Sequence, residues 1–306
     1  MIETIKPIVF VPESTGVRIL TREGEVYAIR TDRITTIAER LSLEEDAVKG
    51  SIDCIVDYKQ WSALQVFIAE VKQEAAYLAI VLKNGGEYKL EFIDIKEKFP
   101  NIPELPATAA PKLLHFKPIA IACLQSHLSN DLRSIYVNQN GAYATNYLIA
   151  AYTEAFKEDK VQLYPAEILG DMAGQFLVAH EGDKMYIASK EFIIVTAQPV
   201  LEDESNFLAI AEMFKENIKY TPALQLSEQL KRISLFDEVV IFDKQLIKSK
   251  CGTEPSPVFT EVPIDFDVLP LLPIIDGAEY IGFSELGHMY IKKGTIVYMA
   301  SRRDAQ

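Results

Sequence analysis

The stretch that decides the fold is Asp131-Leu-Arg-Ser-Ile-Tyr-Val-Asn-Gln-Asn-Gly-Ala-Tyr-Ala-Thr-Asn-Tyr-Leu-Ile-Ala150. A β-rich run over residues 135–137 is followed by a turn that contains Gly141, and a second run ends in Thr145-Asn146. Short runs of β-branched and aromatic residues separated by Gly and Asn are typical of antiparallel strands. The stretch therefore predicts two neighbouring strands joined by a tight turn.

The same plan occurs in two other parts of the chain. Residues 18–32 run from Arg18 through a turn at Gly24 to Thr31-Asp32, and residues 236–249 form a looser copy. Repeats at this distance indicate a duplicated domain, because the units of a solenoid are shorter. The Pro-rich residues 99–111 and the acidic residues 201–205 separate the copies into blocks of about 105 residues, a usual domain size. We predict domains over residues 1–110, 111–216 and 217–306.

Amphipathic patterns predict a few short helices among these strands. Apolar residues recur at helical spacing over residues 58–72, 118–128 and 224–235, and more weakly over 164–172. Asn84-Gly85-Gly86 lies between two strand-like runs and indicates a hairpin. Residues 268–275 contain two prolines and are expected not to form a regular helix. The pattern favours an α+β fold of antiparallel sheets.

The charge and the cysteines exclude several classes of protein. Lys and Arg number 31 against 44 Asp and Glu, so a net charge of −13 excludes nucleic-acid binding by the whole surface. Any DNA contact needs a local basic strip. An odd number of scattered cysteines and the absence of a signal peptide or a long apolar run predict a cytoplasmic protein with no membrane segment. The scattered histidines predict no metal, and we expect no cofactor.

In the order of these elements the sequence resembles the bacterial DNA polymerase III beta sliding clamps, as a diverged and shortened member. Residues 131–137 and 144–150 stand where the family has a Leu-Arg-Gly strand and then Ala-Thr-Asp-Gly-His-Arg-Leu. Leu163-Tyr-Pro-Ala-Glu-Ile-Leu169 matches a Pro-initiated helix, residues 98–100 match an Asp-Phe-Pro junction, and residues 297–303 match the closing Met-Pro-Met-Arg. The first helix of the family is expected to be missing from residues 1–15.

The resemblance implies three tandem clamp-type domains in an arc, with antiparallel sheets and short helices on one face. It also implies a homodimeric ring that encircles duplex DNA, a processivity role for a DNA polymerase, and no catalysis. Helix-borne cations would offset phosphate charge without sequence specificity. The candidates are Lys59, Lys72, Lys117, Arg133, Lys231 and Arg232. The alternative interpretation is that these six are ordinary solvated surface residues.

The resemblance also implies an apolar cleft that receives short peptides from polymerases and other clamp-binding proteins. In the family the cleft is built from the Ala-Thr-Asp-Gly-His-Arg-Leu loop, the linker between the second and third domains, and the C-terminal residues. The corresponding residues are Thr145, Tyr147, Leu148, Ile149, Ala150, Val297, Tyr298, Met299 and Ala300. Gly-His-Arg is replaced by Tyr-Leu-Ile, so the peptide motif is expected to differ. The alternative is a buried strand end.

Ring closure would pair an edge strand of the first domain with the third domain of a second copy, giving a C2 dimer. Leu90 and Phe92 facing Leu235 and Phe236 are the candidates. The alternative is that all four belong to the cores of their own domains.

Two competing functions stay open. An enzyme would draw on the carboxylates Glu202, Asp203 and Glu204, or on Asp265 and Asp267, although adjacent acids in a loop usually form a solvated surface. Cys54 and Cys123 lie in apolar contexts typical of core thiols. A clamp-fold interaction module that does not encircle DNA is the second competitor.

Overall fold

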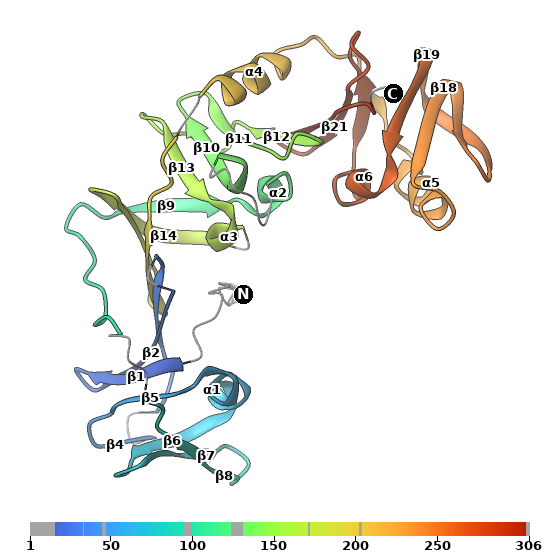
Figure 1. The fold of residues 1–306 in the computed structure, drawn as a ribbon. Helices are drawn as coiled ribbons and strands as arrows, with labels where there is room; N and C mark the ends of the chain where they lie inside the picture. Colours follow the sequence, from blue (N-terminus) through green and yellow to red (C-terminus); the bar gives the residue numbers. More distant parts are fainter. Residues whose placement is uncertain are drawn as a thin grey trace. The chain divides into compact units, whose positions relative to one another are not determined.

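The computed structural model describes residues 16–32, 34–44, 47–94, 99–123, 131–170, 172–201 and 204–303. Contacts between residues divide this part of the chain into two compact units (Figure 1). The N-terminal unit contains residues 16–114 and 174–198, and the C-terminal unit contains residues 115–173 and 199–303. The division into three domains with boundaries near residues 110 and 216 stays a prediction.

The N-terminal unit contains an antiparallel sheet in the order β5-β1-β2-β3-β16-β15-β14-β9. Strand β3 pairs with β16, so that Ile37 lies opposite Ile194 and two segments far apart in sequence share one sheet. The strands are β1 (Gly16–Arg22), β2 (Glu25–Thr31), β3 (Thr36–Arg40), β5 (Asp53–Asp57), β9 (Ala110–His115), β14 (Ala173–Glu181), β15 (Lys184–Ala188) and β16 (Phe192–Ala197).

A second sheet and one helix complete this unit. The sheet has the order β4-β6-β7-β8, with β4 (Val48–Lys49), β6 (Ile68–Gln73), β7 (Tyr77–Leu82) and β8 (Glu87–Glu91). Helix α1 (Tyr58–Leu64) begins where the Asp57 carboxylate accepts a hydrogen bond from the Gln60 amide at 2.9 Å. Its Trp61 is fully buried in a core that includes Ile19 of the first sheet and Leu78 of the second.

The prediction of a helix over residues 58–72 is correct only for its first half. Helix α1 and a 3-10 turn, η2 (Gln65–Phe67), are followed by strand β6, whose Val71 lies opposite Ile80 of β7. Ile68 and Val71 are buried in both interpretations, so the apolar spacing alone does not separate a helix from a bulged strand. Residues 68–73 form a strand because they pair with β7.

The C-terminal unit contains an eight-stranded antiparallel sheet in the order β13-β10-β11-β12-β22-β21-β20-β17. Strand β12 pairs with β22, which joins residues 149–153 to the last strand that the structure describes. The strands are β10 (Ser134–Asn138), β11 (Gly141–Thr145), β12 (Ile149–Thr153), β13 (Gln162–Pro165), β17 (Thr221–Pro222), β20 (Tyr280–Phe283), β21 (Met289–Lys293) and β22 (Ile296–Ala300). A long hairpin of β18 (Val239–Ser249) and β19 (Gly252–Asp267) lies between β17 and β20 in the sequence. It forms its own two-stranded sheet.

Helices cover both faces of the eight-stranded sheet (Figure 1). Helix α2 (Lys117–Ala120) contacts β10, β11 and β12, and α3 (Ala166–Leu169) contacts β10 and β13. Helix α4 (Ser205–Met213) contacts β11 from the other face. The remaining helical elements are η3 (Asp131–Arg133), α5 (Leu226–Ile233) and α6 (Val268–Ile275). None of the helices in the described part of the chain is long and apolar enough to cross a membrane.

Two copies of the predicted repeat have the same local structure. The Asp32 carboxylate accepts hydrogen bonds from the amides of Ile34 and Thr35 at 2.9 and 2.6 Å. The Asn146 side-chain oxygen accepts from Leu148 and Ile149 at 3.1 and 2.8 Å. In both copies an Asx turn therefore joins the hairpin to the next strand. The third copy differs, because residues 239–249 form the single strand β18.

Other helix predictions need correction. Residues 268–275 do form helix α6, although Pro273 lies inside it. Pro270 lies in the first turn, where an amide needs no helical partner, and burial of Val268, Leu271 and Ile274 offsets the helical hydrogen bond that Pro273 cannot donate. The helix predicted over 118–128 is seen only as α2, since residues 124–130 lie outside the described residues. Helix α3 is shorter than the predicted 164–172. The missing first helix of residues 1–15 also lies outside the described residues.

Candidate functional site

In the C-terminal unit, the first residues of β12 and β21 and the last residue of β22 lie side by side. In the register of β12, β22 and β21, Ala300 lies opposite both Ile149 and Met289. The residues just beyond these positions therefore emerge at one edge of the sheet. We call residues 146–148, 285–288 and 301–303 the strand-end loops.

Hydrogen bonds hold two of these loops together. The Ser301 amide donates to the carbonyl oxygen of Leu148 at 2.9 Å, and the Ser301 hydroxyl donates to that of Tyr147 at 3.3 Å. Tyr147 has a φ of +70°, a left-handed conformation that costs a non-glycine residue energy. The Arg303 amide donates to the Asp265 carbonyl at 2.8 Å, which fixes the C-terminal segment against β19.

The nine predicted cleft residues do not line one surface. Tyr147 and Leu148 are 61% and 51% exposed in the strand-end loops. Because strand side chains alternate, Ala150 and Met299 face α4, whereas Tyr298 faces the other way and donates to the Pro118 carbonyl at 2.8 Å. The buried residues are Thr145, Ile149, Ala150, Tyr298, Met299 and Ala300, and Val297 is half-buried.

The sequence interpretation missed Leu286, which is 60% exposed in the turn between β20 and β21. It belongs to the strand-end loops because Met289 lies opposite Ala300. No sequence signal indicates this position, since it depends on the pairing of β21 with β22.

Aromatic side chains form a row on the face of the sheet that α4 covers. We call this surface the α4 face, and its members are Tyr136, Tyr143, Ala150, Tyr152, Tyr290, Val297 and Met299. Phe207 of α4 stacks on Tyr136 with 4.7 Å between ring centroids. Phe214, just after α4, contacts the rings of Tyr152 and Tyr290 at 5.4 and 6.2 Å. The linker between the predicted second and third domains therefore packs on three predicted cleft residues, Ala150, Val297 and Met299.

Two hydrogen bonds attach the ends of α4 to the sheet. The Tyr136 hydroxyl donates to the Glu204 carboxylate at the start of the helix. The Tyr290 hydroxyl donates to the Met213 carbonyl at the end of the helix. Burial, reinforced by the bond to Glu204, raises the pKa of Tyr136 to about 12, so this phenol keeps its proton at neutral pH.

Most of the candidate DNA-binding cations have carboxylate partners. Lys231 lies 2.7 Å from Asp276, Arg232 lies 2.6 Å from Glu254, and Arg133 forms an ion pair with Glu167. Hydrogen bonds to these partners raise the pKa of Lys231 and Arg232. Each positive charge is thus offset locally.

The other three cations differ in position. Lys72 is not on a helix as predicted but on strand β6, where its ammonium lies 2.7 Å from the Glu74 carboxylate. Lys59 is exposed on α1 and forms no ion pair with any residue that the structure describes. Lys117 is exposed at the first position of α2.

The candidate dimer residues fall into two classes. Leu90 is 4% exposed and Phe92 is half-buried, and both pack in the core of the N-terminal unit. Their side chains therefore fit the core alternative, although β8 is the edge strand of its sheet. Leu235 and Phe236 are 75% and 70% exposed just after α5. These two are free to contact another molecule.

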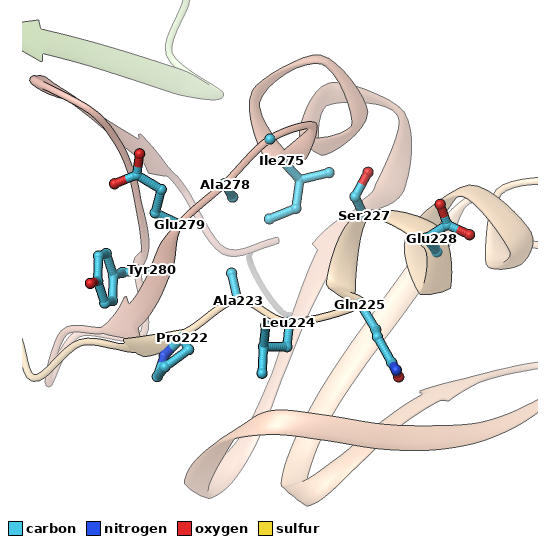
Figure 2. A pocket seen from close by; sticks show the side chains of 11 residues that line it. Pro222, Ala223, Leu224, Gln225, Ser227, Glu228, Ile275, Ala278, Glu279 and Tyr280 are labelled. Atoms are coloured by element: carbon cyan, nitrogen blue, oxygen red, sulfur yellow. The ribbon is translucent and has the colours of Figure 1, made fainter.

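A pocket of about 500 Å³ lies between the start of α5 and the segment that follows α6 (Figure 2). Leu224, Ile275 and Tyr280 supply apolar surface, and Glu228 and Glu279 add two carboxylates to the lining. Its eleven described lining residues include no lysine or arginine, so the pocket does not suit a phosphate group. It contains none of the residues predicted from sequence.

The groups considered for catalysis are dispersed. Glu202 and Asp203 lie outside the described residues, Glu204 binds Tyr136, and Asp267 pairs with Arg303 at 3.5 Å. Among the described residues no cluster of three or more His, Cys, Asp or Glu residues could hold a metal ion. Burial raises the pKa of the Cys54 and Cys123 thiols to about 12, as expected for core cysteines.

Neither a protein-family model nor a curated protein matches the chain. Solved structures do. The Helicobacter pylori beta clamp in complex with 3,4-difluorobenzamide matches with a TM-score of 0.72 and 12% identity, over 95% of this chain and 92% of that chain. The same clamp bound to a DNA ligase peptide gives 0.70 and 14%, over 94% and 91%. The Thermotoga maritima DNA polymerase III beta subunit gives 0.71 and 14%, over 100% and 94%. These matches show the fold, and they confirm the α+β clamp fold and the resemblance found in the sequence.

Proposed function

We propose that the chain is a DNA sliding-clamp-like processivity factor that encircles duplex DNA as a homodimeric ring and docks a DNA polymerase or other replication proteins. The supporting observation is agreement in fold with beta clamps over more than nine-tenths of both chains. Three tandem clamp-type domains, a cytoplasmic location and the absence of catalysis and cofactors are parts of the same proposal.

Loose attraction to DNA is the electrostatic requirement of such a ring. Four of the six candidate cations are held by carboxylates, and exposed ion pairs of this kind are weak because water and salt screen them. Phosphates can therefore compete for Lys231 and Arg232 at little cost. Weak, exchangeable contacts of this kind suit a protein that slides rather than grips.

Ring closure is proposed between the β8 edge of one copy and the third domain of the other. The exposed pair Leu235 and Phe236 supplies apolar surface, and β8 supplies unpaired backbone groups. Partner docking is proposed at the strand-end loops and the neighbouring α4 face, because Tyr147, Leu148 and Leu286 are exposed at one edge of the sheet. The DNA ligase peptide in the Helicobacter pylori complex sets a precedent for the class of ligand.

Retention on circular DNA tests the ring. The protein is incubated with a nicked circular plasmid, with a clamp loader supplied if needed, and the plasmid is isolated and then linearised. We expect retention on the circle and release after linearisation, because only a topological link depends on DNA ends. Equal retention on both forms would overturn encirclement.

A second candidate function is a clamp-fold interaction module that does not encircle DNA. The observation that favours it is the neutralisation of Arg133, Lys231 and Arg232 by carboxylates, together with a helix α6 that carries no charged residue. Light scattering after size exclusion separates the two functions. A stable monomer at micromolar concentration would favour the module, and a dimer would favour the ring.

A further inference from the structure

We propose that helix α4 is a displaceable cover on the α4 face and that a docking partner must displace it to reach Ala150 and Met299. The inference rests on the proposed docking function. It adds a conformational step, namely a competition between a segment of the chain itself and the incoming peptide.

The cover is defined by the side chains that α4 places on the sheet. Phe207 is 1% exposed and stacks on Tyr136, while Ile210, Met213 and Phe214 pack on a cluster that contains Ala150, Tyr290 and Met299. Ala150 and Met299 are 1% and 4% exposed with α4 in place. A peptide therefore cannot contact them while α4 is docked.

The attachment of α4 is weak by the standards of the sheet beneath it. The helix has nine residues, and helices this short are marginal in water without tertiary contacts. The N-cap residue Glu204 gives the helix no side-chain capping hydrogen bond, and its carboxylate accepts from Tyr136 instead. Phe207 is the one α4 residue with a described side chain that is fully buried, and Leu208 is 50% exposed. Local opening of α4 should therefore cost much less than unfolding of the sheet.

The packing of α4 also indicates what could replace it. Among the residues that pack on the sheet, Phe207, Ile210 and, just after the helix, Phe214 are bulky and apolar at positions i, i+3 and i+7. The surface that they leave is a row of tyrosine rings beside Met299. A competing segment should accordingly present bulky aromatic and aliphatic side chains.

Thiol labelling measures the opening directly. Cysteine is introduced by Ala150→Cys in a Cys251→Ser background, and its reaction with 5,5′-dithiobis(2-nitrobenzoate) is followed across low urea concentrations. We expect slow labelling whose rate depends on urea much less than global unfolding does. Phe207→Ala should accelerate labelling at least about tenfold, and Leu208→Ala, on the exposed side of the same helix, should change it less than about twofold. Met299→Cys provides a second reporter.

Tyr290→Phe is a milder variant that keeps the test decisive if Phe207→Ala does not fold. It removes only the bond to the Met213 carbonyl, and it should change labelling in the same direction. Labelling that requires global unfolding in every variant, or that is unchanged by both substitutions, would overturn the cover.

Peptide binding tests the competition. The probe is the DNA ligase peptide of the Helicobacter pylori complex, labelled with fluorescein. Phe207→Ala should bind it at least about tenfold more tightly than wild type, because a larger fraction of molecules is open, and Leu208→Ala should bind as wild type does. Equal binding to all three would overturn the role of α4 while leaving docking intact. Absence of binding to every variant would remove the docking function itself, and with it the competition.

Discussion

The phenolic hydroxyl of Tyr290 donates a hydrogen bond to the main-chain carbonyl of Met213, with 3.0 Å between the two oxygens. This bond joins strand β21 to the last residue of α4 and is one of two that attach the ends of the helix. Tyr290 is also 1% exposed, so its ring forms part of the surface that α4 covers. A single side chain thus serves both the sheet core and the attachment of the linker helix.

Tyr290→Phe should lower the free energy of unfolding by about 0.5–1.5 kcal/mol, the usual net worth of one hydrogen bond. The loss should be concentrated in α4, because the ring and its packing remain. Hydrogen exchange of the amides of residues 205–213 should accelerate, while exchange in β10–β12 should stay as in wild type. Tyr280→Phe, at an exposed ring, is the matched control and should change neither.

Thiol reactivity should separate the three cysteines sharply. Burial raises the pKa of Cys54 and Cys123 to about 12, whereas Cys251 is exposed at the β18–β19 turn. At pH 8, therefore, one thiol per native chain should react rapidly with 5,5′-dithiobis(2-nitrobenzoate), and Cys251→Ser should abolish that phase. A second rapid thiol in the folded protein would contradict the burial of the other two.

Much of the fold could be predicted from sequence because its signals are local. The run through Gly141 forms β10 and β11 as expected, and the Asn84-Gly85-Gly86 turn joins β7 to β8. The Asx turn at Asn146 was not predicted. The prediction of a helix over residues 58–72 was wrong in its second half, because apolar spacing alone does not separate a helix from a bulged strand. Helix α4 was not predicted, although Phe207, Ile210 and Phe214 recur at helical spacing in the sequence.

The candidate site was harder to predict because it depends on long-range pairing. No local pattern shows that β12 pairs with β22 or that β3 pairs with β16. Without that register, Leu286 could not be assigned to the strand-end loops, and Tyr298 could not be placed on the face opposite Met299. Ion-pair partners such as Asp276 for Lys231 also come from distant segments.

Stability should depend on pH through the pair of Arg18 and Asp53. The Arg18 guanidinium donates two hydrogen bonds to the Asp53 carboxylate, at 2.7 and 2.9 Å, and holds the pKa of Asp53 below its usual value. A carboxyl with a lowered folded pKa stabilises the protein above its unfolded pKa of about 3.9, and the contribution is lost as the pH falls through the folded pKa.

The urea midpoint of wild type should thus fall between pH 5 and pH 3 more than that of Asp53→Asn. Arg18→Gln should flatten the profile to a similar degree, and the double variant should behave like either single one. Additive effects of the two substitutions would show that the pair is not the source of the pH dependence.

Releasing two cations from their carboxylates should strengthen DNA contact. Asp276→Asn and Glu254→Gln together free Lys231 and Arg232 at the end of α5. If this helix faces DNA, each freed cation can neutralise one phosphate, and the slope of log affinity against log salt should steepen by about 1–2. Binding to a short duplex is titrated at several salt concentrations. Glu212→Gln frees Lys215 instead, which is not among the candidate cations, and should leave the slope unchanged.

Tyr147→Gly should separate backbone strain from peptide recognition. Tyr147 has a φ of +70°, so glycine relieves the left-handed conformation but adds conformational freedom to the unfolded chain. These effects oppose each other, and the free energy of unfolding should change by less than about 1 kcal/mol.

Glu23→Gly makes the same backbone change at a φ of +55° in the β1–β2 turn, away from the strand-end loops. The DNA ligase peptide should bind Tyr147→Gly several-fold more weakly than Glu23→Gly, because only the former removes an exposed ring from the docking edge. Equal affinity for the two variants would exclude the Tyr147 ring from the docking surface.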